Sequence, residues 1–307
     1  MTTFLDAVTA DHFDTEVLQQ HWIPLAKEDT DTAAVLRERL GVDFAAARDR
    51  VRETDDFLYF PVVANYQRGE TIERETIVFA LGSEFLVTLQ PSEHFLPFDK
   101  AVAKMRRNPA LTGSAQGVMY ALLWALNETS ERVIRTTSET LAQVRDEIET
   151  ATGGHDERGR VIDLRRAMSR MDAAEQIVSR IKETQLQLAR AARHLAADTP
   201  PGHRELDGLS NVLLADIDGV KQHAGIQHDT VRYLQHSVLT WSAVRQNRIV
   251  TVLTTIVAIF LPPTLIATLY TWMPEVQWQY GFLAATPMTL LAAVLPLAYI
   301  RKKGWLR

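Results

Sequence analysis

The sequence predicts an α+β cytoplasmic domain of the α/β/α type, followed by a long stalk helix that is continuous with a two-helix transmembrane hairpin. Three observations predict this architecture. Two apolar runs without a charged side chain, residues 249–270 and 280–300, stand near the C-terminus. A stretch without proline, residues 203–261, leads into the first run. Segments rich in β-branched and aromatic residues are found before residue 105.

The two apolar runs are long enough to cross a bilayer. A hydrocarbon core of about 30 Å requires about 20 helical residues, and the runs contain 22 and 21 residues. Residues 271–279 then form the external loop between them. A buried hairpin in a soluble protein is the alternative, but soluble cores rarely contain two charge-free runs of this length in succession.

Basic residues lie on one side of this hairpin. Six of them stand just before the first run or just after the second: Arg245, Arg248, Arg301, Lys302, Lys303 and Arg307. The external loop carries no Lys or Arg and a single acid, Glu275. Because Lys and Arg remain on the cytoplasmic side, we expect a multi-pass protein of the cell (inner) membrane with both termini in the cytoplasm and residues 301–307 as a basic cytoplasmic tail.

Residues 1–105 are expected to form the α/β part of the cytoplasmic domain. Three strands and two short helices are predicted there: 57–65, 76–81, 85–89, 30–40 and 43–52. The last two strands are expected to form a hairpin, because Leu81-Gly82-Ser83-Glu84 is typical of a tight turn. Pro61 has no backbone N–H, so the first strand should lie at a sheet edge or carry a bulge.

From residue 106 onward the sequence is helical in character. Residues 106–202 are expected to form a helical hairpin, with helices over 111–151 and 156–197. These helices stop at Gly153-Gly154 and at Thr199-Pro200-Pro201-Gly202, which are strong helix breakers. Residues 203–248 continue as the stalk helix into the first span. A helix of this length is not stable alone, so we expect partners along it, other subunits among them.

Composition excludes several function classes. The net charge is −5, with acids outnumbering bases before the membrane runs, and nucleic-acid binding requires the opposite sign. The absence of cysteine excludes disulfides and thiolate metal sites. No phosphate-binding glycine loop or nucleophile elbow occurs, so we do not expect an enzyme.

A zinc site within one chain is not expected either. The histidines of the stalk, His223, His228 and His236, are spaced by five and eight residues, which does not place two zinc ligands on one helix face.

A polar stripe runs along the first span. Steps of three or four residues from Asn247 give the seven-residue repeat of a helix packed in a bundle. We call this set the seam: Asn247, Val250, Thr254, Val257, Leu261, Thr264 and Thr268. Hydroxyl and amide groups that face a shared axis can contact a hydrated ion. Alternatively, the threonines bond to their own helix carbonyls or hold neighbouring helices together. The second span has almost no polar stripe and is expected to face lipid.

Several motifs at the C-terminus resemble those of the CorA family of divalent-cation channels. They are QNR at 246–248, FLPPTLIA at 260–267, MPE at 273–275, YGF at 280–282 and KKGWL at 302–306. The similarity extends upstream to LLADID at 213–218 on the stalk. The helical layout agrees over most of the chain, while the first hundred residues agree in broad pattern.

The resemblance implies a homopentamer of funnel-like cytoplasmic domains that conducts Mg²⁺ inward, with Co²⁺ and Ni²⁺ as alternative ions. It implies that the seam lines an axial pore, with Asn247 at its inner mouth and Leu261 and Val250 as apolar constrictions. Mg²⁺ would also be a regulatory ligand that closes the channel from a site between subunits, in which Asp216 takes part. Arg301, Lys302 and Lys303 would form a basic collar around the stalk, and lipid would surround the spans.

One departure from the family pattern bears on transport. The family reads Tyr-Gly-Met-Asn-Phe, two variable residues and Met-Pro-Glu, whereas this chain reads Tyr270-Thr271-Trp272-Met273-Pro274-Glu275. The missing asparagine ring holds the incoming ion in the family. Glu275 remains, and a ring of its carboxylates would concentrate cations at the external mouth. Two hypotheses follow: a Mg²⁺ channel, or a membrane scaffold or ion sensor with lost or altered transport. A zinc transporter of the same superfamily is a third.

Overall fold

The computed structural model describes residues 21–46, 50–69, 71–92, 94–152, 164–197, 204–272 and 281–302. The chain divides into two compact units, Met1–Gln235 and His236–Arg307. The strands of the first unit are β1 (Trp22–Ala26), β2 (Arg52–Glu53), β3 (Leu58–Arg68), β4 (Thr71–Leu81) and β5 (Leu86–Gln90). Its helices are α2 (Thr30–Leu40), η1 (Phe44–Ala46), α3 (Leu96–Arg107), η2 (Pro109–Gly113), α4 (Ala115–Thr152) and α5 (Leu164–Ala197). The helix α6 (Arg204–Trp272) begins in the first unit and ends in the second, which also contains α7 (Gly281–Lys302).

The five strands form one sheet in the order β1-β5-β4-β3-β2. β1 pairs with β5 in parallel, and all other pairs are antiparallel. The predicted hairpin between β4 and β5 is confirmed, because Leu81 pairs with Leu86 and the Gly82 N–H donates to the Phe85 carbonyl at 3.0 Å. β1 was not predicted from the sequence. It joins the sheet with the indole N–H of Trp22 bonded to the Thr88 hydroxyl at 3.0 Å.

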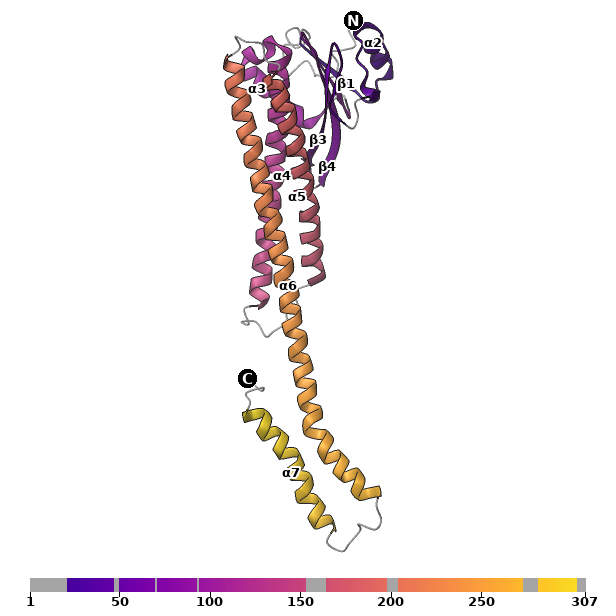
Figure 1. Cartoon of the computed structure of the whole chain (residues 1–307), viewed down its shortest axis with the longest axis vertical. Coiled ribbons are helices and arrows are strands. Elements are labelled where there is room, and N and C mark those ends of the chain that lie inside the picture. The colour runs from indigo at the N-terminus through magenta and orange to yellow at the C-terminus, as the bar shows by residue number, and fades with distance from the viewer. Residues whose placement is uncertain are drawn as a thin grey trace. The chain divides into compact units, whose positions relative to one another are not determined.

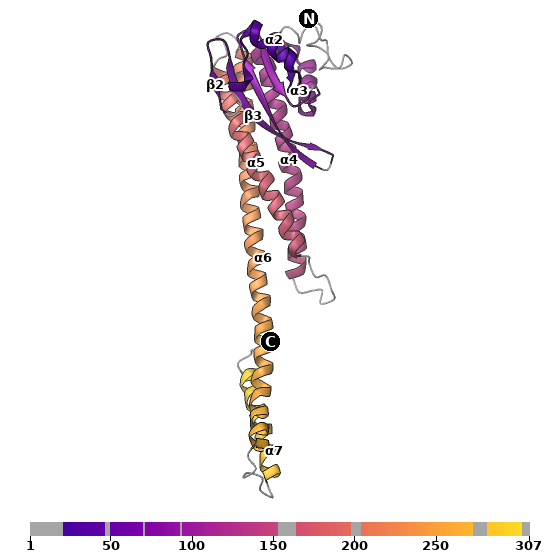
Figure 2. The ribbon, with the colours of Figure 1, turned by 90° about the vertical axis from the view of Figure 1, so that its right-hand side faces the viewer.

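The sheet lies between two layers of helix, as Figure 1 and Figure 2 show for α2 on one side and α4 and α5 on the other. Successive side chains of a strand point to opposite faces, and both faces of this sheet are buried. The face toward α3 and α4 contains Phe60, Val62, Ala64, Ile77 and Phe79. The opposite face packs under α2 with Leu25, Tyr59, Val78 and Ala80 against Leu36 of the helix. The predicted α/β/α arrangement is therefore confirmed.

β3 behaves as an edge strand at Pro61, as predicted. β2 pairs with β3 only at Leu58 and Tyr59, so no described strand pairs with Pro61 on that side. Farther along, α5 covers the same edge. The Gln187 side-chain oxygen accepts from the Val63 N–H at 2.7 Å, and the Thr184 hydroxyl donates to the Val63 carbonyl at 2.8 Å. Side chains of a helix thus satisfy backbone groups that a neighbouring strand would otherwise bind.

The helix expected over 43–52 is wrong. One 3-10 turn, Phe44–Ala46, stands at its start, and β2 occupies Arg52–Glu53 at its end; residues 47–49 lie outside the described residues. Asp43 explains part of the difference, because its carboxylate accepts from the Ala45 N–H at 3.1 Å and its own N–H donates to the Tyr59 hydroxyl at 3.0 Å. A local side-chain bond and a tertiary bond replace the helical ones.

The helical side of the first unit contains α4, α5 and the first part of α6. α4 begins four residues later than predicted, because the Ser114 hydroxyl accepts from the Gly117 N–H at 3.1 Å and caps the helix there. α4 and α5 are joined by Arg170, whose guanidinium donates to Glu147 at 2.8 Å and to Gln143 at 3.0 Å. Buried residues of α4, α5 and α6 share a common apolar core. α3 was not predicted.

α6 is a single helix of 69 residues, so the predicted uninterrupted stalk and first span are confirmed as one helix. Neither Gly208, Gly219 nor Gly225 breaks it. Pro262 and Pro263 lie inside it, and although each removes one helical hydrogen bond, the helix continues to Trp272. α6 is long and apolar enough to cross a membrane, and its most apolar stretch has no buried side chains. α7 contains a shorter apolar stretch, Thr286–Tyr299.

Candidate functional site

The seven seam residues lie on the part of α6 that belongs to the second unit. All seven side chains are exposed in the single chain. Their neighbours on the other faces, such as Leu253, Ile256 and Phe260, are exposed as well. The half-buried side chains of this stretch, Thr251, Thr255 and Ile266 among them, lie on a different face of the helix from the seam. Three of the seven seam side chains carry hydroxyl groups and one carries an amide, in a segment otherwise rich in Ile, Val and Leu.

The seam threonines bond to the backbone of their own helix. The hydroxyl of Thr254 donates to the Val250 carbonyl at 2.7 Å, and that of Thr268 donates to the Thr264 carbonyl at 2.7 Å. Thr264 donates to the Leu261 carbonyl at 2.8 Å and to the Phe260 carbonyl at 3.0 Å. These are the internal bonds that the sequence left open as an alternative. Each hydroxyl oxygen still has lone pairs directed outward, which suit water molecules around a cation.

The C-terminal end of α6 shows how the chain is built where the family motif is missing. α6 continues through Tyr270 and Thr271, between which the four residues Gly-Met-Asn-Phe are absent, and ends at Trp272. The backbone is thus helical across the junction. Glu275, the candidate for the external mouth, lies outside the described residues.

Asp216 lies on the part of α6 that belongs to the first unit, and its side chain is exposed. Its charge shifts the pKa values of two side chains on other helices, Tyr120 on α4 and Lys104 on α3. Burial raises the pKa of the Tyr120 phenol, and the Asp216 carboxylate raises it further. Burial lowers the pKa of the Lys104 ammonium, with a further lowering from Arg107, while Glu128 and Asp216 oppose the shift. Asp216 therefore stands near a cation supplied by α3.

Lys104 is held by aromatic rings. Its Nζ lies 3.8 Å from the ring centroid of Trp124 and 5.5 Å from that of Tyr120, both on α4. A cation over an aromatic face is stabilised by the ring quadrupole. Sequence reasoning missed the proximity of Lys104 and Tyr120 to Asp216. The spacing of Tyr120 and Trp124 by four residues indicates a shared helix face, but nothing in the sequence connects that face to α3 or α6.

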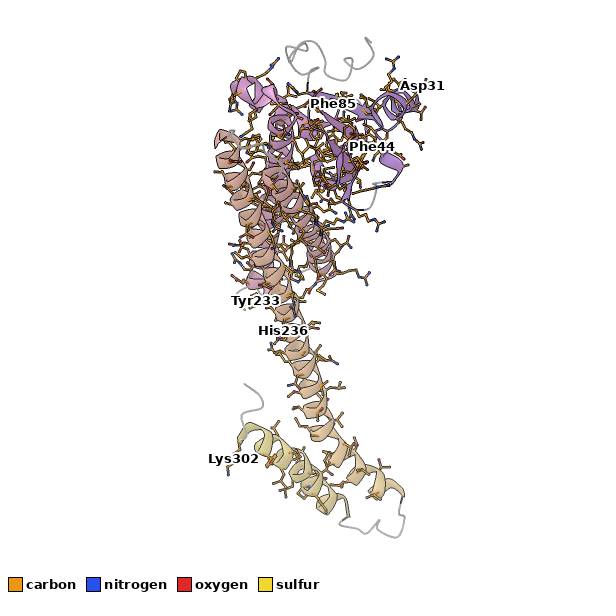
Figure 3. All side chains as sticks on the ribbon, turned by 45° about the horizontal axis from the view of Figure 1, so that its top comes forward. Asp31, Phe44, Phe85, Tyr233, His236 and Lys302 are labelled. Atoms are coloured by element: carbon orange, nitrogen blue, oxygen red, sulfur yellow. The ribbon has the colours of Figure 1, made fainter. Side chains whose placement is uncertain are left out.

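The remaining candidates are the basic collar and a metal cluster within one chain. Lys302 ends α7 and is exposed, as Figure 3 shows. The side chain of Arg301 and the whole of Lys303 lie outside what the structure describes. In the described part of the chain, no group of three or more His, Asp or Glu side chains is arranged to hold a metal ion. Asp216 is therefore not part of such a group among the described residues.

Comparisons with known proteins find similarity over most of the chain. A family model described as CorA-like Mg²⁺ transporter protein matches residues 17–302. The magnesium transport protein CorA of Escherichia coli (strain K12) is 26% identical over 307 residues, covering 93% of this chain and 92% of that protein.

Solved structures share the fold. The complete structure of the CorA magnesium transporter from Methanocaldococcus jannaschii matches with a TM-score of 0.71 at 14% identity, over 92% of this chain and 90% of that one. The full-length CmaX protein matches with a TM-score of 0.59 at 16% identity, over 92% and 87%. At these identities the matches show the fold, in which an α/β domain and long helices belong to the same chain.

Proposed function

Because the chain belongs to the CorA-like Mg²⁺ transporter family, we propose that it is a channel through which Mg²⁺ flows into the cell. The family match over residues 17–302 carries this proposal, because it includes the α/β domain, the stalk and both apolar helices together. The relative from Escherichia coli that covers 93% of this chain is named a magnesium transport protein. Co²⁺ and Ni²⁺ are further candidate ions, since they share the charge of Mg²⁺.

The channel is proposed to be a homopentamer in which five copies of α6 surround one pore. A stripe of exposed apolar residues supports self-association. Val212, Ile226 and Tyr233 are spaced by multiples of seven residues along α6, with exposed fractions of 55%, 62% and 68%; Figure 3 labels Tyr233. A seven-residue apolar repeat is the pattern by which helices pack against one another at a shallow angle.

The seam is proposed to line this pore. Each threonine hydroxyl donates its single proton to a carbonyl of its own helix. Its oxygen therefore presents acceptor lone pairs to the axis and can bind the water shell of a cation. Val250, Val257 and Leu261 separate the polar positions as apolar rings, which can close a pore by excluding water. α7 is proposed to be the outer, lipid-facing helix.

The orientation in the membrane is proposed from the positions of the basic residues. With the basic residues on the cytoplasmic side, both termini are proposed to lie in the cytoplasm, and Arg301, Lys302 and Lys303 form a collar at the inner face of the cell membrane. Glu275 is then proposed to lie at the external mouth, where a ring of carboxylates would attract cations. The comparisons favour transport over the membrane scaffold that the missing Gly-Met-Asn-Phe segment suggested.

Reconstituted protein tests the transport proposal. In liposomes containing a Mg²⁺-sensitive dye, the full-length protein is expected to admit Mg²⁺ faster than protein-free vesicles. An inside-negative potential should increase the rate, because each elementary charge gains about 2.3 kcal/mol per 100 mV. Uptake equal to that of protein-free vesicles at every potential would contradict a channel and leave the scaffold.

Regulation by cytoplasmic Mg²⁺ is proposed to act through Asp216. A hard cation prefers oxygen ligands, and the exposed carboxylate of Asp216 is free to meet a neighbouring subunit. Asp216→Asn is expected to raise the Mg²⁺ concentration that half-closes the channel by about tenfold. This is the lower end of the loss of metal affinity that follows when a metal site loses a supporting group. Flux is measured at several internal Mg²⁺ concentrations.

Asp207→Asn is the matched control, because Asp207 is also an exposed acid on α6 and its loss changes the charge equally. Half-closure at the same concentration in the Asp216→Asn variant and the wild type would exclude Asp216 from the regulatory site.

A further inference from the structure

A small cavity in the first unit is lined by cationic side chains and takes no part in the proposed ion pathway. Its volume is about 210 Å³, and it lies between the end of β3, the first turn of α3 and the middle of α4. Its polar wall is formed by Tyr66, Gln67, Lys100, Thr129 and Arg132. The residues come from three elements that are far apart in sequence and are held together by the apolar core.

The charged side chains that line this cavity are both cations. Lys100 pairs with Glu128 at a separation of 3.8 Å between Nζ and Oε2, and the charge of Glu131 also acts on it. Arg132 also lines the cavity, and within the described ranges it forms no ion pair closer than 4.0 Å. Arg132 is exposed, and Lys100 is half-buried. The residues that line the cavity thus carry two positive charges and no negative one.

Neighbouring acids are already engaged elsewhere. Glu131 accepts from Arg135 on the same helix at 2.5 Å. The Glu73 carboxylate accepts the Tyr66 hydroxyl at 2.6 Å and lies 3.7 Å from Arg68. Burial, and after it the bond to Glu73, raise the pKa of Tyr66 to about 12, so this phenol stays neutral. None of these acids lines the cavity.

The N-terminus of α3 adds to the positive potential. Leu96 and Pro97, the first two residues of α3, line the cavity. The cap residue Phe95 makes no side-chain hydrogen bond to the helix, so no carboxylate or hydroxyl of the cap residue occupies that end. The backbone dipole of a helix favours an anion at its N-terminus. The carboxylate of Asp99, in the same turn, lies 3.4 Å from the imidazole of His94.

The two cations also repel each other. Burial lowers the pKa of the Lys100 ammonium, and the charge of Arg132 lowers it further, while Glu128 and Glu131 act in the opposite direction. An anion between Lys100 and Arg132 would relieve this repulsion and satisfy both donors.

We propose that the cavity binds a phosphate group, with Lys100 and Arg132 as its counter-ions and the α3 N-terminus as a further contact. The volume suits one phosphate rather than a whole nucleotide. Arg binds tetrahedral oxyanions through two parallel N–H donors. Thr129 favours phosphate over a carboxylate, because its hydroxyl donates to the Ala125 carbonyl at 2.7 Å and its oxygen is left to accept from a P–OH group.

Titration of the purified full-length protein in detergent tests this site. Inorganic phosphate is added at constant ionic strength, with chloride as the balancing anion, and binding is followed by calorimetry. Arg132→Gln and Lys100→Gln are each expected to weaken binding by about tenfold or more, since a charge-assisted hydrogen bond contributes about 1.5–3 kcal/mol. Arg135→Gln removes the same charge one turn away on α4, outside the cavity, and should leave binding unchanged.

Two further arms make the result decisive. ATP is titrated in parallel: binding of inorganic phosphate identifies a free anion as the ligand, whereas binding of ATP alone, lost in Arg132→Gln, identifies the phosphate of a nucleotide. Phosphate should also raise the unfolding temperature of the wild type and not that of Arg132→Gln, because a ligand that binds only the folded state stabilises it. Arg132 is exposed, so its variant is expected to fold. Absence of binding, or equal binding by the wild type and Arg132→Gln, would overturn the proposal.

Discussion

Asn247→Leu is expected to reduce Mg²⁺ uptake by at least about tenfold in reconstituted vesicles. In the proposed pentamer, five amides at the inner mouth become five isobutyl groups. Each lost hydrogen bond to the hydrated ion is worth about 1 kcal/mol, and 1.4 kcal/mol already corresponds to a tenfold change. An apolar ring at this position would also favour loss of water from the pore. The uptake rate is measured with protein density per vesicle held constant.

A pair of adjacent threonines provides the matched control for the seam. Thr254 belongs to the seam, whereas Thr255 lies about 100° further around the helix. Val has nearly the shape of Thr and lacks the hydroxyl, so Thr254→Val and Thr255→Val make the same chemical change on two faces. Uptake should fall in Thr254→Val and remain near the wild-type value in Thr255→Val.

Two results of this comparison would contradict the proposal that the seam lines the pore. Equal uptake in both threonine variants and in Asn247→Leu would mean that these side chains do not face the ion. A larger loss in Thr255→Val than in Thr254→Val would mean that a different face of α6 lines the pore.

Gly117→Ala is expected to lower the unfolding temperature by roughly 6–12 °C. A Cβ at this position would overlap the carbonyl oxygen of Leu111 and lie 3.0 Å from its carbonyl carbon. Both atoms are backbone, so relief requires displacement of η2 from the start of α4. Overpacking of this kind costs about 3 kcal/mol, and 1 kcal/mol shifts the midpoint of a large domain by about 2–4 °C. Thermal unfolding of the detergent-solubilised protein measures the shift.

Gly208→Ala makes the same substitution in a helix without a clash. A Cβ at Gly208 meets nothing within 4 Å, and Ala is favoured over Gly in a helix by about 1 kcal/mol. This variant should unfold about 2–4 °C above the wild type. An unfolding temperature for Gly117→Ala as high as that for Gly208→Ala would show that α4 does not approach Leu111 as closely as the structure has it.

Local sequence signals were sufficient to predict the structure where the conformation of a segment depends on its own residues. The helix Thr30–Leu40 has the bounds that the sequence predicted, because Asp29 caps its start by accepting from the Thr32 N–H at 3.0 Å and Gly41 ends it in the left-handed region at φ 72°. α5 ends at Ala197 as predicted, shortly before Pro200 and Pro201. Capping residues, glycine and proline act over a few residues, so they can be recognised in a sequence.

Local signals failed where distant segments determined the result. Residues 43–52 have helical spacing, yet Arg52 and Glu53 pair with Tyr59 and Leu58 in the sheet. β1 pairs with β5 in parallel across more than sixty residues of chain, a partner that no local pattern identifies. The length of β3 was underestimated as well, because its pairing with β4 continues to Arg68 and Thr71. In each case the hydrogen bonds of a neighbouring strand outweigh the intrinsic preference of the segment.

The sequence by itself determined the two apolar runs, the uninterrupted course of α6, the polar seam and the family, because apolar length, helix breakers and short motifs are all written in consecutive residues. The roles of the seam, of Asp216 and of the basic collar remain predictions. Only the tertiary structure decided what surrounds these residues. It brought Lys104 and Tyr120 within electrostatic range of Asp216, and it placed Lys100 and Arg132 on the wall of one cavity. Such groupings arise when a common apolar core folds distant helices together, and the spacing of residues along the chain carries no record of them.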